Sequence, residues 1–206
     1  MQIAILLFDD VTALDAVGPY EVLSRIPGAT VTWTASTPGP KKAKGGLTLL
    51  ADGRLEDVPS PQIVLVPGGA GVDKTMQDPA VIRWIRAVHE TSRFTTAVCT
   101  GALILGQAGL LRGLKATTHW NYRERLAAFG TDVLAERVVR EGKIVTAAGV
   151  SAGIDMALRL VQWVAGDRAA QAIQLGIEYD PDPPFDAGSP EKAAPEIVEI
   201  LRRARR

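Results

Sequence analysis

The chain has 206 residues, enough for one domain with a full hydrophobic core, and we expect a single domain over residues 1–206. Lys plus Arg equal Asp plus Glu at 23 each, which argues against nucleic acid as a partner, and we interpret the basic stretch 202–206 as a solvated helix end. No apolar run approaches the roughly 18 residues of a membrane span, so we expect no membrane association. A lone cysteine and no export signal predict a cytoplasmic protein.

Apolar and β-branched runs predict the strands in the first half of the chain: 2–8, 30–36, 47–50, 63–66 and 94–98. The Gly- and Pro-rich stretch 38–46 is expected to be a loop. Helical periodicity and turn residues in the whole chain predict helices at 19–26, from 79, from 101 to about 109, at 122–129, from 151, from 167 and at 190–205.

Two local features refine these predictions. Asp78 should cap the helix that Pro79 begins, with Ile82, Ile85 and Val88 on its inner side. Residues 136–140 and 143–146 flank Glu141-Gly142 as a hairpin-like pair. Alternating strands and helices with short connections predict a three-layer α/β sandwich around a mostly parallel sheet.

Ligands of open parallel sheets collect at the carboxyl ends of the strands. Cys99 is the only cysteine and lies where the strand 94–98 turns into the next helix, as in a nucleophile elbow. Helix amides there would favour a thiolate. A lone cysteine is more often an inert core residue, but the turn position favours a nucleophile here.

The first strand is followed by Asp9, Asp10 and Asp15. Asp15 has apolar neighbours, so burial would raise its pKa and leave a proton to share with a thiolate. The alternative is that Asp15 caps the helix beginning nearby. Asp9 and Asp10 are interpreted as loop acids.

The strand 63–66 ends in a glycine loop, in which Gly68, Gly69 and Ala70 could form an oxyanion-type pocket with the Thr100 amide. The alternative is a simple tight turn; the loop lacks the spacing and the Lys of a P-loop. His119 is either a base for the thiol or a hydrogen-bonded structural residue. His89 is expected to be structural, and the few scattered ligand residues predict no metal site.

Several segments together resemble the DJ-1/PfpI superfamily, which is related in fold to class I glutamine amidotransferases, and within it the bacterial isonitrile hydratases. The matching segments include Val66-Pro-Gly-Gly-Ala-Gly-Val72, Val98-Cys-Thr-Gly101 and Ala116-Thr-Thr-His-Trp120, and the later matching segments are specific to the subgroup. The likeness also covers 14–15 with 18–19, 108–111, 136–140, 153–155, 178–179, 183–185 and 187–190.

This resemblance implies a homodimeric enzyme that needs neither metal nor organic cofactor and converts an isonitrile, its small-molecule substrate, and water to an N-substituted formamide. It implies Cys99 as nucleophile, Asp15 as acid/base and Thr100 as a neighbour that tunes the site. Many superfamily members have Glu where Asp15 falls, and the protease-like branch has His where Thr100 falls. These departures argue against a peptidase and favour the hydratase branch.

Three alternatives stay open beside that function. Cys99 with His119 could act on α-oxoaldehydes as a glyoxalase or deglycase. Cys99 could instead serve as a redox sensor that is oxidised without turnover. A regulator's ligand domain is disfavoured, because no helix-turn-helix segment follows before Arg206.

Overall fold

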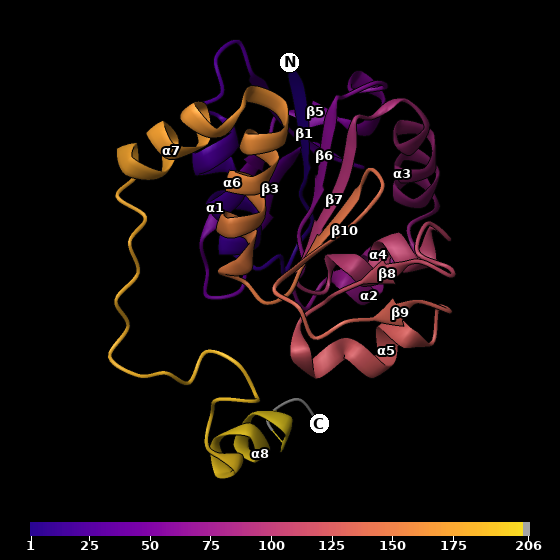
Figure 1. Ribbon diagram of the computed structural model, residues 1–206. Helices are drawn as coiled ribbons and strands as arrows, with labels where there is room; N and C mark the ends of the chain where they lie inside the picture. Colours follow the sequence, from indigo (N-terminus) through magenta and orange to yellow (C-terminus); the bar gives the residue numbers. More distant parts are fainter. Residues whose placement is uncertain (204–206) are drawn as a thin grey trace.

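The computed structural model describes residues 1–203, so the last three residues of the basic stretch 202–206 lie outside the described part. Seven strands form one sheet in the order β10-β11-β7-β6-β1-β2-β5 (Figure 1). Only β10 runs antiparallel to its neighbour, which confirms the predicted α/β fold with a mostly parallel sheet. The strands of this sheet are β1 (Gln2–Leu6), β2 (Thr30–Ala35), β5 (Gly53–Arg54), β6 (Ile63–Val66), β7 (Phe94–Val98), β10 (Val138–Glu141) and β11 (Ile144–Ala147).

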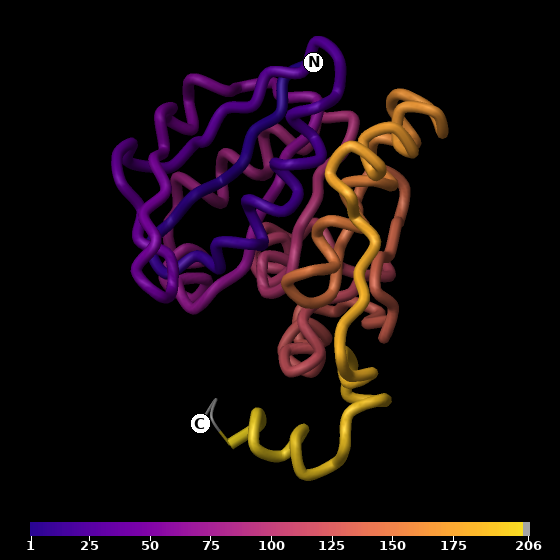
Figure 2. Tube along the Cα trace, turned by 90° about the vertical axis from the view of Figure 1, so that its left-hand side faces the viewer, coloured from indigo at the N-terminus to yellow at the C-terminus, as the bar shows by residue number. Residues whose placement is uncertain are grey.

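Helices cover both faces of the sheet and make the three predicted layers (Figures 1 and 2). One face is covered by α1 (Ala13–Leu23), α6 (Ala152–Ala165) and α7 (Asp167–Gly176). The other is covered by α2 (Val72–Met76), α3 (Pro79–Thr91), α4 (Gly101–Gln107) and α5 (Arg123–Ala127). None of the helices within residues 1–203 is long and apolar enough to cross a membrane.

Smaller elements complete the fold. Two strand pairs lie outside the main sheet: β3 (Gly39–Lys42) with β4 (Thr48–Ala51), and β8 (Lys115–Ala116) with β9 (Asp132–Val133). Two short 3-10 helices are η1 (Leu55–Asp57) and η2 (Trp120–Tyr122). The last helix, α8 (Pro195–Arg203), lies apart from the layers at the end of a long irregular segment (Figure 1).

The central strand β1 shows why the first apolar run forms a strand. Its side chains alternate between the two helical layers: Ile3 and Ile5 belong to the cluster under α1 and α6, and Ala4 and Leu6 to the opposite cluster. All four are fully buried. Burying each larger one stabilises the fold by ~1.5–3 kcal/mol, so a strand covered on both faces requires an unbroken apolar run.

The structure corrects two boundaries in the first half of the chain. The expected loop 38–46 contains β3, which pairs antiparallel with β4. The helix expected from Pro19 begins at Ala13, so Pro19 lies inside α1. Pro19 packs closely against α6, because a Cβ at Gly153 would lie only 3.0 Å from Pro19 Cγ.

Helix α3 begins as predicted, since the Asp78 carboxylate accepts a hydrogen bond from the Ala80 N–H at 2.9 Å. Its inner side differs from the prediction. Ile85 and Val88 are fully buried, whereas Ile82 is only partly buried, and Val81 and Trp84 are buried instead. The hairpin is confirmed by β10 and β11, and the last helix begins five residues later than expected, at Pro195.

Candidate active site

The carboxyl ends of three adjacent strands form the candidate site. In the order β7-β6-β1, the segments that follow these strands carry Cys99, Gly68 and Asp15. They meet in space, because the Gly68 N–H donates a hydrogen bond to Asp15 Oδ2 at 2.9 Å. The Gly68 carbonyl accepts another from the Thr12 N–H at 2.9 Å, which joins the β6 and β1 loops. The predicted convergence of these loops is therefore present.

Cys99 occupies a strained turn between β7 and α4. Its φ of 57° lies in the left-handed region, which a non-glycine residue seldom adopts. Two hydrogen bonds hold that backbone: the Cys99 N–H donates to the Ala147 carbonyl at 3.0 Å, and the Cys99 carbonyl accepts from the Thr118 hydroxyl at 2.7 Å. The residue is only 6% exposed. Strain held from both sides is typical of a residue placed for function rather than for packing.

Asp15 is buried in the third position of α1, where its side chain faces the protein interior. The N-cap of α1 is Thr12, so the alternative that Asp15 caps the helix is wrong. The carboxyl interacts with the Cys99 side chain as well as with the Gly68 amide. Its second oxygen, Oδ1, is buried and has no hydrogen-bond partner within residues 1–203. A buried oxygen without a hydrogen-bond partner destabilises the fold, so its presence here favours a functional role for Asp15.

Burial changes the ionisation of both side chains. Desolvation raises the pKa of Asp15 from 3.8 to about 7, opposed by its hydrogen bonds to Gly68 and Cys99. Desolvation also raises the pKa of Cys99, and the charge of Asp15 raises it further. The Thr100 amide and hydroxyl lower the Cys99 pKa, but by less than burial raises it. The Thr100 amide thus favours the thiolate as expected, but burial outweighs it, so the pKa of Cys99 lies above its usual range and a negative charge on Asp15 opposes a second one on the sulfur.

The glycine loop after β6 holds the catalytic candidates in place. While the Gly68 amide binds Asp15, the Gly69 amide donates to Thr100 Oγ1 at 2.9 Å. A Cβ at Gly68 would lie 2.5 Å from the Thr100 nitrogen and 2.9 Å from Asp15 Oδ2, so only glycine allows this approach. Two of the amides expected to form an oxyanion-type pocket are thus already engaged with Asp15 and Thr100.

A cavity of about 420 Å³ opens above Cys99 and Thr100. The predicted residues Gly69, Ala70 and His119 also line it. The remaining lining residues were not singled out from the sequence: Thr12, Lys44, Trp120, Asn121, Tyr122, Val150 and Leu201. For most of these the sequence carries no signal, because they come from loops far apart in the chain. Leu201 is the exception, because it belongs to an apolar i, i+3, i+4 pattern in α8 that marks it as part of an apolar helix face.

The two histidines lie in different surroundings. His119 is the N-cap of η2, and its Nδ1 accepts a hydrogen bond from the Asn121 N–H at 3.3 Å. The hydrogen bond to Asn121 agrees with a structural role for His119. Its position in the lining of the cavity agrees with a role as a base. On α3, His89 Nδ1 forms a hydrogen bond of 2.9 Å with the Thr95 hydroxyl of β7. Within residues 1–203, no group of three or more His, Cys, Asp or Glu side chains is arranged to hold a metal ion.

Comparison with known proteins decides the family. The model of the DJ-1/PfpI family matches residues 1–163. The chain belongs to the DJ-1/PfpI family. Among relatives, the isonitrile hydratase of Pseudomonas putida is 43% identical over 203 residues, which cover 98% of this chain and 89% of that protein. The HTH-type transcriptional regulator CdhR of Pseudomonas aeruginosa is 29% identical, and the match spans 76% of this chain but 48% of the regulator.

Solved structures of the DJ-1/PfpI family agree with the fold. A ThiJ/PfpI family protein from Pseudomonas syringae superposes with a TM-score of 0.96 at 35% identity, covering 98% of this chain and 85% of that one. DJ-1beta of Drosophila melanogaster superposes with a TM-score of 0.79 at 20% identity, covering 86% of this chain and 97% of that one, a likeness that concerns the fold alone. This chain is thus a DJ-1/PfpI protein and a homologue of isonitrile hydratase over nearly its full length.

Proposed function

We propose that this protein is an enzyme that adds water to an isonitrile and releases an N-substituted formamide. The 43% identity to an isonitrile hydratase over 98% of the chain supports the reaction. The observation that carries the proposal is the buried contact between Asp15 and Cys99. With the Asp15 pKa raised to about 7, the carboxyl can both give and take a proton at neutral pH.

In the first half of the reaction, the pair holds one proton and one negative charge. The sulfur of Cys99 forms a bond to the terminal isonitrile carbon, and the proton held by Asp15 passes to the same carbon. The carbon–nitrogen triple bond becomes a double bond, so the product is a thioimidate on Cys99 and Asp15 is left as a carboxylate. Thr100, whose amide and hydroxyl interact with the sulfur, lowers the cost of the thiolate that attacks.

In the second half, water attacks the thioimidate carbon. Asp15 takes a proton from this water and passes it to the substrate nitrogen. It then takes the proton of the new hydroxyl while the carbon–sulfur bond breaks, which releases the formamide and the thiolate. Asp15 is again protonated, so the site returns to its starting state. These steps use only Cys99, Asp15 and water, without a metal or an organic cofactor.

The test is direct turnover of a simple alkyl isonitrile, followed by the appearance of the formamide proton in the NMR spectrum. Cys99→Ala should abolish turnover, and Asp15→Asn should lower kcat by ~10²–10⁴-fold, the usual contribution of a placed acid/base. Asp10→Asn is the matched control: it removes a carboxylate of the same loop, and asparagine tolerates the φ of 61° found there. Near-normal turnover by Asp15→Asn would refute these roles.

Methylglyoxal distinguishes the α-oxoaldehyde alternative in the same assay. If Cys99 and His119 form a glyoxalase-like pair, methylglyoxal should be consumed and His119→Gln should stop its consumption. We expect the isonitrile to be the far better substrate, because the acid/base that contacts the sulfur is Asp15. Efficient turnover of methylglyoxal with none of the isonitrile would reverse this assignment.

We also propose that the enzyme is a homodimer in the cytoplasm. Large apolar side chains outside the core support a second copy as partner, because Leu175 and Phe185 are 80% and 78% exposed. A nucleophile that must stay a reduced thiol supports a reducing compartment. Light scattering of the purified protein tests the dimer, and cell fractionation tests the compartment.

A further inference from the structure

One wall of the cavity above Cys99 comes from the far end of the chain. Helix α8 is joined to α7 by residues 177–194, which contain neither helix nor strand (Figures 1 and 2). Despite this distance in sequence, Leu201 of α8 lines the same cavity as Cys99 and Thr100. A helix that belongs to neither helical layer thus contributes a side chain to the lining of this cavity.

The sequence of α8 places its apolar residues together. Ile197, Ile200 and Leu201 follow the i, i+3, i+4 spacing, while Glu199 and Arg203 form an ion pair at 3.0 Å on the opposite side. No residue of α8 is buried, and Leu201 is 51% exposed. An apolar side chain that is half exposed beside a reactive cysteine offers surface that a ligand can cover.

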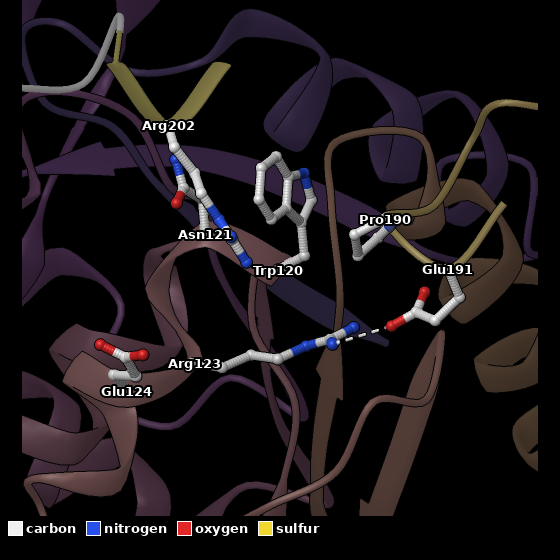
Figure 3. Close-up of a pocket in the computed structure, with 7 residues that line it drawn as sticks. All are labelled: Trp120, Asn121, Arg123, Glu124, Pro190, Glu191 and Arg202. Carbon is white, nitrogen blue, oxygen red and sulfur yellow. Dashed lines mark hydrogen bonds and ion pairs between the residues drawn. The ribbon is translucent and has the colours of Figure 1, made fainter. Parts of the chain in front are cut away.

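An ion pair links the segment before α8 to the start of α5. Arg123 forms an ion pair with Glu191 at 3.1 Å, just before the helix. Arg202 lies beside Asn121 and Trp120 along a second cavity of about 760 Å³ (Figure 3). Trp120 and Asn121 line both cavities, so the two cavities adjoin at η2.

The geometry of an isonitrile determines which part of it meets this wall. The terminal carbon, the nitrogen and the first atom of the substituent lie on one line. With the carbon at the buried sulfur of Cys99, the substituent extends away from the sulfur into the cavity that Leu201 lines. Trp120 and Val150 add apolar surface to the lining of the same cavity.

We infer that Leu201, together with Trp120, contacts the substituent on the isonitrile nitrogen and selects bulky apolar substituents over small ones. This inference depends on the proposed function and specifies its substrate class: isonitriles that carry an aryl or branched alkyl group. Leu201 is a specificity-determining residue that takes no part in proton transfer or in bond formation.

The first test compares benzyl isonitrile with ethyl isonitrile. Leu201→Ala should lower kcat/KM for benzyl isonitrile about 5–20-fold, mainly through KM, and change the value for ethyl isonitrile less than about twofold. Ile200→Ala is the matched control, because it removes an apolar side chain of the same helix that is not part of the cavity lining. An unchanged benzyl-to-ethyl ratio in Leu201→Ala overturns the inference, and so does an equal fall in Ile200→Ala.

A second test does not depend on isonitrile turnover. Cys99 is the sole cysteine, so its alkylation by iodoacetamide and by N-benzyl iodoacetamide can be followed by intact mass. The ratio of the benzyl to the parent rate should fall in Leu201→Ala and stay constant in Ile200→Ala. If the wild type hydrates neither isonitrile, the proposed function fails, and this ratio alone decides whether Leu201 contacts the substituent.

Discussion

Asp15 and Cys99 interact in the protein interior, and a negative charge on either one opposes the ionisation of the other. The charge of Asp15 raises the pKa of Cys99, while burial raises the pKa of both. The pair therefore loses its first proton as one unit, with an apparent pKa that belongs to both groups. Asp15 lies on α1 and Cys99 on the turn after β7. Because the two residues are far apart in sequence, their coupling exists only in the folded protein.

This coupling predicts the pH dependence of turnover. Below the pKa of about 7 found for Asp15, both groups are protonated and the sulfur cannot attack. We expect kcat/KM for an alkyl isonitrile to rise with pH through an apparent pKa of about 7 and then to level off. Because isonitriles also react in acid, the rate with Cys99→Ala is subtracted at each pH. A profile that is flat from weakly acidic to weakly basic pH would contradict this prediction.

The same pKa makes a prediction for stability. Asp15 ionises with a pKa of 3.8 when unfolded and about 7 when folded, so its contribution to stability is lost as pH rises between these values. Asp15→Asn carries no charge to bury and should be more stable than the wild type by about 2–4 kcal/mol at pH values above 7. The difference should vanish below the unfolded pKa. Urea unfolding below pH 3.8 and above pH 7 measures this difference in the free energy of unfolding. If Asp15→Asn is less stable than the wild type at high pH, burial of the Asp15 carboxylate does not destabilise the fold.

Gly68→Ala should remove activity without touching a reacting group. The added Cβ would lie 2.5 Å from the Thr100 nitrogen and 2.9 Å from Asp15 Oδ2, so the β6 loop or the Cys99 turn must shift. A displacement of this size in a site for proton transfer should lower kcat at least about 100-fold. Gly176→Ala is the control, because a Cβ there meets nothing within 4 Å. Equal activity of the two variants would show that the approach of Gly68 is unimportant.

Thr100 should act through its hydroxyl. Thr100→Val keeps the shape but removes the oxygen that accepts the Gly69 N–H at 2.9 Å, leaving a partly buried amide unpaired. The hydroxyl also lowers the pKa of Cys99, so its loss should lower kcat about 10–100-fold and move the rise of the pH profile to higher pH. Thr100→Ser retains the hydroxyl and should keep most of the activity. If serine and valine are equally impaired, packing of the methyl group matters and the hydroxyl does not.

Local sequence patterns were sufficient to predict elements whose signals lie within the element itself. The unbroken apolar run of β1 predicts a strand buried on both faces, and Asp78-Pro79 predicts the start of α3, because these signals depend on neighbours in the chain. The same reasoning failed for α1. Its early residues give no clear helical pattern, since the helix is packed on more than one side, against the sheet and against α6.

The sequence by itself determined the class of fold, the strand ends that meet at one edge, and the candidates Cys99, Asp15 and Thr100. Only the tertiary structure decided what these residues have as partners: Gly68 for Asp15, Gly69 for Thr100, and Leu201 above Cys99. The direction of the Cys99 pKa shift was decided there too. The reason is that hydrogen-bond partners, desolvation and cavity walls come from segments distant in the chain, whose approach leaves no local pattern in the sequence.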